Sequence, residues 1–142
     1  DGRRQRPCPQ RQRASGRPRR CGWLDLVAVR YSAMICGATS IACMLLDVLS
    51  GFDELKICSS YRMPDGSVTE RFIPDARGLL DAQPIWETLP GWQGEIDDTQ
   101  DRADLPPEAL GYLARIEEIL GLPIHLVSVG PERTQTLEGT RC

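Results

Sequence analysis

Residues 41–51, IACMLLDVLSG, decide the fold that the sequence predicts. The first six, 41–46, are apolar without a break, and Asp47 and a Ser50-Gly51 turn signal follow. A short apolar run bounded by turn residues indicates a β-strand buried on both faces. Open α/β sheets bind ligands at the C-terminal ends of such strands, where Asp47 lies. Asp47 therefore either caps or turns the chain after a core strand, or binds a ligand.

A second apolar run, residues 123–127 (PIHLV), predicts another short buried strand, and Ser128, Val129 and Gly130 follow it. Helices alternate with these strands, which favours a parallel pair with both C-terminal ends at one sheet edge. A carboxylate accepts two parallel N–H bonds, which matches the ring N–H and amino group of guanine. The sheet edge could therefore hold a guanine base. The exposed backbone groups expected at residues 128–130 would form hydrogen bonds with the remaining polar edge of that base.

Periodicity and turn residues predict the other elements. Helices are expected at residues 23–36 and at 106–121, the second capped by Asp104. The remaining expectations are a hairpin over 54–73, one or two helical turns over 75–82, a loop with two aromatic anchors over 85–92, and a polar surface segment over 95–104.

The composition indicates a single soluble domain of 142 residues, 41% apolar and 26% charged. No stretch approaches the roughly 20 apolar residues that span a membrane, and no apolar signal segment begins the chain. The six cysteines contain no C-x-x-C pair, so Cys36, Cys43 and Cys58 are predicted as buried free thiols in a reducing cytoplasm. His125, the only histidine, lies in an apolar run and is interpreted as structural. No metal ligand is predicted.

Arginine is concentrated at the N-terminus, where residues 1–20 hold eight Arg and one Asp. Residues 1–13 have no hydrophobic periodicity and are predicted to be a disordered basic arm. Such an arm binds nucleic acid, is a solvated tail, or is sequence that does not belong to the fold, and the absence of interleaved aromatic residues argues against nucleic acid. In residues 14–22, ASGRPRRCG, closely spaced arginines on a Gly-Pro loop suit anionic groups.

Five segments together resemble the C-terminal third of adenylosuccinate synthetase over about residues 14–137. They are GRPRRCGWLD, LLDVLSGFDELKIC, TLPGW, YLARIEEILGLPI and SVGPERTQT. The resemblance implies an α/β fold that forms the C-terminal portion of a P-loop-NTPase-like, mainly parallel sheet with flanking helices and a β-hairpin. It also implies a cytoplasmic homodimer that joins IMP and L-aspartate with GTP and Mg²⁺ on the route to AMP.

The resemblance also implies roles for individual residues. The loop that closes on aspartate and IMP would comprise Ala14, Ser15, Gly16, Arg17, Pro18, Arg19 and Arg20. Arg17 would contact IMP as well as the aspartate side, and Arg19 would reach GTP. The other GTP-binding residues would be Leu45, Leu46, Asp47, Ser128, Val129 and Gly130, with Asp47 reading guanine. Ala14-Ser15 stand where the family has two threonines, and Leu45 stands where it has lysine.

The family's Gly-rich phosphate loop, catalytic aspartate and catalytic histidine belong to its N-terminal part. This chain has no such Gly-rich loop, and His125 is not that histidine, so no catalytic residue or Mg²⁺ ligand is assigned here. We therefore expect the chain alone to be inactive. Residues 1–13 are not family-like, which suggests a truncated copy, a disrupted reading frame or a partial gene model. The alternatives are a binding module whose arm meets RNA or another acidic partner, and a poorly folding chain with exposed strand edges.

Overall fold

A computed structural model describes residues 21–139. The predicted basic arm and the loop of residues 14–20 lie outside the described residues. One sheet contains β1 (Leu24–Asp25), β3 (Glu54–Arg62), β4 (Val68–Thr69) and β5 (Gln83–Pro90). The other contains β2 (Ile41–Cys43), β6 (Ile124–Ser128) and β7 (Thr136–Glu138). The helices are α1 (Leu26–Cys36), α2 (Ala76–Asp81) and α3 (Pro107–Leu120), with 3-10 turns η1 (Leu46–Leu49) and η2 (Arg102–Asp104).

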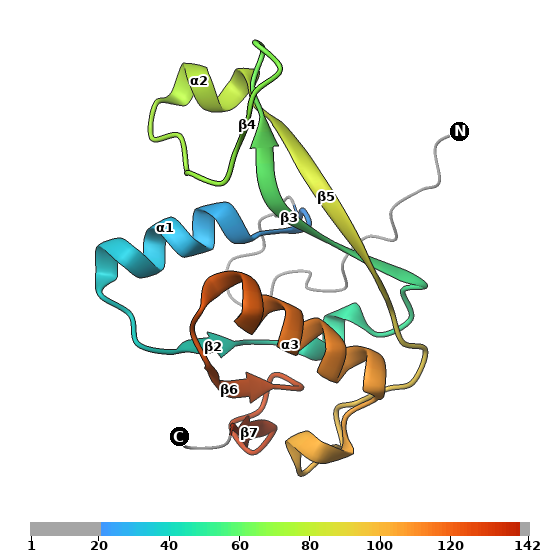
Figure 1. The fold of residues 1–142 in the computed structure, drawn as a ribbon. Coiled ribbons are helices and arrows are strands. Elements are labelled where there is room, and N and C mark those ends of the chain that lie inside the picture. The colour runs from blue at the N-terminus through green and yellow to red at the C-terminus, as the bar shows by residue number, and fades with distance from the viewer. Residues whose placement is uncertain (1–20, 140–142) are drawn as a thin grey trace, which may run out of the picture.

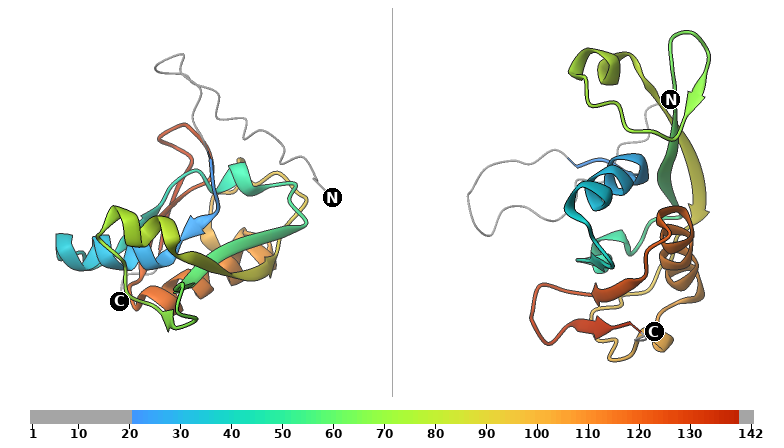
Figure 2. Two further views of the ribbon diagram at one scale, coloured as in Figure 1. Left: turned by 90° about the horizontal axis from the view of Figure 1, so that it is seen from above. Right: turned by 60° about the vertical axis from the view of Figure 1, so that its left-hand side comes forward.

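Both sheets are mixed. β2 pairs with β6 in parallel, as predicted, with Ile41 opposite Ile124 and Cys43 opposite Val127. β1 and β3 are also parallel, whereas β4 and β5 run antiparallel to β3, and β7 runs antiparallel to β6. The α/β class is confirmed, but the sheets are not mainly parallel. The chain is elongated, with α2 and β4 at one end and β6 and β7 at the other (Figures 1 and 2).

The strand predicted for residues 41–46 is shorter than expected and is not buried on both faces. It ends at Cys43, Ala42 is exposed, and the Met44 side chain is 59% exposed. Leu45 adopts a left-handed conformation with φ of 60°, which ends the extended backbone and begins η1. The apolar run predicted burial, but hydrophobicity alone does not predict the change of backbone dihedral angle at Leu45.

The hairpin predicted over 54–73 is present, but its two strands differ in length: β3 has nine residues and β4 has two. β3 pairs with β4 over only two residue pairs, Tyr61 with Thr69 and Arg62 with Val68. The long partner of β3 is β5, which lies where a loop was predicted. Of the two aromatic anchors expected there, Trp92 is buried, but Trp86 is 41% exposed. Prolines at both ends of β5 concealed its alternating pattern of half-buried and exposed side chains.

The helices follow the predictions with corrections at their starts. α1 begins at Leu26 because the Asp25 carboxylate accepts hydrogen bonds from the N–H groups of Val27 and Ala28. It ends at Gly37, whose φ of 63° suits glycine. Asp104 does not cap α3; it belongs to η2, and Pro106 precedes the helix without a side-chain cap. α2 matches the predicted helical turns.

A hydrophobic core joins the two sheets through α1 and α3. Residues of β3, α3, β6 and β7 belong to one cluster, including Ile57, Leu113, Val127 and Leu137. Ile96 is also buried there, so the segment 95–104 is not purely a surface segment. Cys58 is buried, but Cys36 is exposed, contrary to the prediction. Within residues 21–139, no helix has the length and apolar character needed to cross a bilayer.

Candidate functional site

The turn at residues 45–47 directs neighbouring side chains to different surroundings. After the left-handed Leu45, the Leu46 side chain enters the core and is 1% exposed. Asp47 follows and lines a polar cavity with a volume of about 370 Å³. The other residues lining this cavity are Ser50, Gly51, Gln93, Glu95, Ile96 and Asp97.

Trp92 holds the wall of the Asp47 cavity in place. Its indole Nε1–H donates to the Ser50 hydroxyl at 2.9 Å, and its carbonyl accepts from the Gly51 N–H at 2.8 Å. Gly91 makes this approach feasible, because a Cβ added there would lie 2.0 Å from the Phe52 carbonyl oxygen. The end of β5 is therefore fixed against the segment that follows Asp47.

The Asp47 carboxylate is incompletely satisfied. Its Oδ1 atom is buried and has no hydrogen-bond partner among the described residues. Burial raises the pKa of this carboxyl above its ordinary value and the Asp97 carboxylate adds to the rise, while the backbone N–H groups of Asp47 and Val48 oppose it. Because Asp47 lines the polar cavity, its carboxylate is the group there that can accept N–H donors from a ligand.

Residues 128–130 are more enclosed than the sequence predicted. Ser128 and Val129 are buried, and the Ser128 hydroxyl donates to the Gly130 carbonyl at 2.6 Å. The Val129 N–H donates to the Gln135 carbonyl at 2.9 Å. The backbone groups expected to be exposed at Val129 and Gly130 are therefore partly used inside the protein. None of the three residues lines the Asp47 cavity.

Gln135 connects residues 128–130 to the Asp47 cavity. Its side chain lies against Gly130, where an added Cβ would be 2.2 Å from Oε1. Its Nε2 group donates to the carbonyl of Asp97, which lines the cavity. Sequence reasoning missed Gln135, Gln93 and Asp97 because they lie in polar segments without a repeating pattern.

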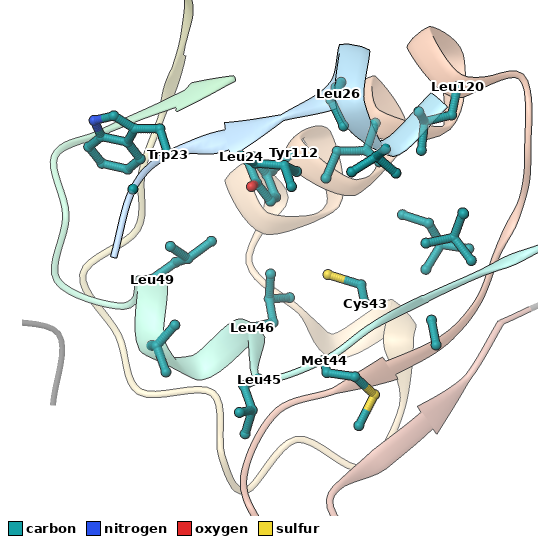
Figure 3. Close-up of a pocket in the computed structure, with 17 residues that line it drawn as sticks. Trp23, Leu24, Leu26, Cys43, Met44, Leu45, Leu46, Leu49, Tyr112 and Leu120 are labelled. Atoms are coloured by element: carbon teal, nitrogen blue, oxygen red, sulfur yellow. The ribbon is translucent and has the colours of Figure 1, made fainter. Parts of the chain in front are cut away.

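Leu45 and Leu46 line a second cavity, which is mainly apolar and has a volume of about 430 Å³ (Figure 3). Its walls come from α1, β2, η1 and α3, together with the segment around Trp23. Cys43 also lines it, and burial raises the pKa of this thiol to about 11, with the positive charge of Arg102 acting in the opposite direction. The predicted nucleotide residues thus divide between two cavities.

The described residues contain no cluster of three or more His, Cys, Asp or Glu side chains able to hold a metal ion. His125 lies half-buried within β6, and its carbonyl accepts from the Gly139 N–H. The loop of residues 14–20, which carries the predicted aspartate and IMP contacts, lies outside the described part of the chain.

Comparison with known proteins identifies the relatives of this chain. The family model for adenylosuccinate synthetase matches residues 10–137. The adenylosuccinate synthetases of Clostridioides difficile and Salinibacter ruber are 48% and 50% identical over 123 residues, which are 87% of this chain. These 123 residues are only 28% of the length of either relative.

A solved structure has a similar arrangement. The fully ligated adenylosuccinate synthetase from Plasmodium falciparum matches with a TM-score of 0.85 and 30% sequence identity. The match covers 88% of this chain and 30% of the solved one. The fold described above is therefore similar to one part of a larger molecule.

Proposed function

Because the chain belongs to the adenylosuccinate synthetase family, we propose that it carries the guanine-binding part of a GTP-dependent ligase that joins IMP to L-aspartate. The observation that carries the proposal is the placement of Asp47 in the lining of a polar cavity, with its buried Oδ1 atom left without a hydrogen-bond partner among the described residues. The 123 matching residues are 28% of the length of the Clostridioides difficile relative, so we propose the complete reaction for the full-length family fold only. By the same resemblance, we propose that this full-length fold is a cytoplasmic homodimer.

Guanine suits this carboxylate for a chemical reason. Its ring N1–H and its 2-amino group donate in parallel, and the two oxygens of an ionised carboxylate accept in parallel. Adenine has no such pair of donors on the corresponding edge. Asp47 therefore provides selectivity for the base, and Leu45, Ser128, Val129 and Gly130 are proposed to complete the surroundings of the nucleotide. This arrangement binds and orients a nucleotide without forming or breaking a bond.

The remaining substrates are assigned to residues 14–20. Arg17 is proposed to contact IMP and aspartate, and Arg19 to contact GTP, since guanidinium groups bind phosphate and carboxylate bidentately. Mg²⁺ does not fit the described residues, because no three of their His, Cys, Asp or Glu side chains are grouped so that they could hold a metal ion. We therefore assign neither the metal nor phosphoryl transfer to residues 21–139, and we expect no turnover by the chain alone.

A nucleotide titration with Asp47→Asn tests the proposal. The unchanged chain is expected to bind GTP more tightly than ATP. Asp47→Asn is expected to weaken GTP binding by about tenfold or more, because one accepting oxygen becomes a donating amide. The same variant is expected to gain affinity for XTP, because xanthine has an oxygen at position 2 that accepts from the asparagine amide. Isothermal calorimetry measures all three nucleotides.

Asp98→Asn is the matched control, because Asp98 is exposed and does not line the cavity. It should bind GTP as the unchanged chain does. The melting temperature of Asp47→Asn at pH 7 checks its folding and should not fall, because the substitution removes a charge whose burial is unfavourable. Equal GTP affinity in the unchanged chain and a folded Asp47→Asn variant would disprove the guanine assignment.

A further inference from the structure

Two separate segments of the chain form the lining of the polar cavity. Among the described residues, those that line it all lie within residues 47–51 or residues 93–97. The first segment contains Asp47 and most of η1, and the second follows the end of β5. The shape of the cavity therefore depends on how these two segments are held against each other.

Trp92 joins the two segments at the point where they meet. Its indole Nε1–H donates to the Ser50 hydroxyl at 2.9 Å, and its carbonyl accepts from the Gly51 N–H at 2.8 Å. The Trp92 side chain is buried in the core, and a buried indole usually pairs its N–H with an acceptor. The Ser50 hydroxyl is that acceptor here.

The bonds of Trp92 continue the pairing of β3 with β5 beyond the end of their ladder. The Gly91 N–H donates to the Asp53 carbonyl at 2.9 Å. On the other side of Trp92, the Gln93 Nε2 group donates to the Asp53 carboxylate, also at 2.9 Å. The two bonds of Trp92 are therefore supported by a bond on either side.

Ser50 connects Trp92 to Asp47. The Ser50 N–H donates to the Asp47 carbonyl at 3.0 Å, where η1 ends. The backbone N–H groups of Asp47 and Val48 face the Asp47 carboxylate and favour its ionised form. The carboxylate is thus oriented by η1, and η1 is fixed to Trp92 through Ser50.

We propose that Trp92 is a positioning residue for base recognition, because it holds η1 at the angle from which the Asp47 carboxylate can accept both N–H donors of guanine. This inference rests on the proposed function of Asp47. The ring N1–H and the 2-amino group of guanine reach the two carboxylate oxygens together only when the carboxylate faces that edge of the base. A rotation of η1 preserves one of these bonds at most. Trp92 itself contacts no nucleotide atom and acts through Ser50.

GTP and ITP distinguish positioning from a general loss of folded protein. The base of ITP has the ring N1–H but no 2-amino group, so it forms one bond with Asp47 where guanine forms two. Trp92→Phe removes the indole N–H and is expected to lower GTP affinity by about tenfold and ITP affinity by less. A loss of folded protein lowers both affinities by the same factor. Isothermal calorimetry on the 142-residue chain measures both.

Ser50→Ala removes the same hydrogen bond from its other side. Ser50 is half-buried, so this variant is expected to fold even if Trp92→Phe does not. It should lower the ratio of GTP to ITP affinity as Trp92→Phe does, and the double variant should lower it no further. Ser50→Thr keeps the hydroxyl, and the extended backbone of Ser50 (φ −61°, ψ 139°) suits a β-branched residue, so the ratio should be retained.

Trp86→Phe is the matched control. It makes the same substitution on β5, at a position that is 41% exposed and does not line the polar cavity. The affinities for GTP and for ITP should both equal those of the unchanged chain.

A titration without nucleotide tests the positioning of Asp47 separately from guanine binding. Burial raises the pKa of this carboxyl. In Trp92→Phe or Ser50→Ala, η1 is released and the carboxyl becomes better hydrated, so its pKa should fall toward the ordinary value. Carboxyl carbon NMR measures this pKa, and Asp47→Asn identifies the signal.

The two experiments separate the possible failures. A GTP-to-ITP ratio that is equal in the unchanged chain, Trp92→Phe and Ser50→Ala would overturn the role of Trp92 and leave Asp47 as the guanine-binding residue. An Asp47 pKa that is the same in all three proteins would also overturn it. An unchanged chain that prefers GTP neither to ITP nor to ATP would overturn the proposed function, and base recognition by way of Trp92 with it.

Discussion

Cys43 illustrates how burial changes the chemistry of a single side chain in this molecule. Its thiol lines the apolar cavity, and burial raises its pKa from the ordinary 9.0 to about 11. Only the thiolate reacts with alkylating reagents, so a raised pKa slows the reaction. At pH 8, about a hundredfold less thiolate is present than for an ordinary thiol.

We predict slow alkylation of Cys43 by iodoacetamide. At pH 8, its rate should be about a hundredfold lower than that of a thiol in a short unstructured peptide, and it should rise with pH toward 11. Peptide mapping by mass spectrometry measures the rate for each cysteine. Exposed Cys36 is the internal reference, and alkylation of both thiols at one rate in the folded protein would contradict the prediction.

Asp47 and Leu45 show which features of single residues the hydrophobic pattern of the sequence predicts and which it does not. Asp47 could be singled out from sequence because a charge directly follows an apolar run. The conformation of Leu45 could not, because leucine has no preference for positive φ and local packing must maintain it. That one dihedral angle sends Leu46 and Asp47 to different cavities, which hydrophobicity alone does not specify.

At the scale of elements, Arg115 connects α3 to β5. Its Nε and Nη2 atoms bind the two oxygens of Glu87 at 2.7 and 2.8 Å, and its Nη1 atom binds Glu118 at 2.6 Å. The guanidinium of Arg115 holds the pKa of Glu87 below its ordinary value of 4.5. This bidentate pair holds β5 against the helix, while pairing with β3 along its length makes the segment a strand in spite of its terminal prolines.

We predict that Glu87→Gln lowers stability by about 1 kcal/mol at pH 7. The pKa of Glu87 is lowered on folding, so the ion pair stabilises the fold above the ordinary pKa of 4.5. This contribution is lost as the pH falls below 4.5 and through the lowered folded-state pKa. Thermal denaturation at pH 7 and at about pH 3 measures both limits.

Glu118→Gln is the control for that experiment. Glu118 binds the same arginine, but its side chain is 70% exposed, so its loss should have a smaller effect than that of Glu87. A destabilisation that is as large at pH 3 as at pH 7 would show that Glu87 acts through packing and not through charge.

At the scale of the whole molecule, one core spans both sheets. Leu113 of α3 is fully buried in the cluster that also contains Ile57 of β3 and Val127 of β6. A shared core couples the two sheets, and a domain of this size then unfolds in a single transition. The β2 edge lies at the surface of the molecule, outside this shared core.

We predict that Leu113→Ala lowers the free energy of unfolding by about 3 kcal/mol, through lost burial and a residual cavity. Scanning calorimetry should still give one transition, with calorimetric and van't Hoff enthalpies that agree. Leu110→Ala, at a partly buried position of the same helix, should have a clearly smaller effect. Two separate transitions, of which only one shifts in Leu113→Ala, would show that the sheets unfold independently.

Features of the fold that depend on residues close together in the sequence could be predicted, and those that depend on distant residues could not. Local apolar runs predicted the α/β class and the parallel pairing of residues 41–43 with 124–127. Glycines predicted the C-termini of α1 and α3. The pairing of β3 with β5 and the contact of Gln135 with Asp97 could not be predicted. Those contacts join segments distant in sequence, and no local pattern records them.

The hydrogen bond from Trp92 to Ser50 means that the intrinsic fluorescence of Trp92 can report on the Asp47 cavity. The Trp92 indole lies beside the Asp47 cavity through this bond, whereas Trp23 lines the apolar cavity and Trp86 is on the surface. Each cavity therefore has its own intrinsic fluorophore. In variants that retain one tryptophan each, the emission of residue 92 would follow the filling of the polar cavity. The emission of residue 23 would follow the filling of the apolar cavity, without an attached dye.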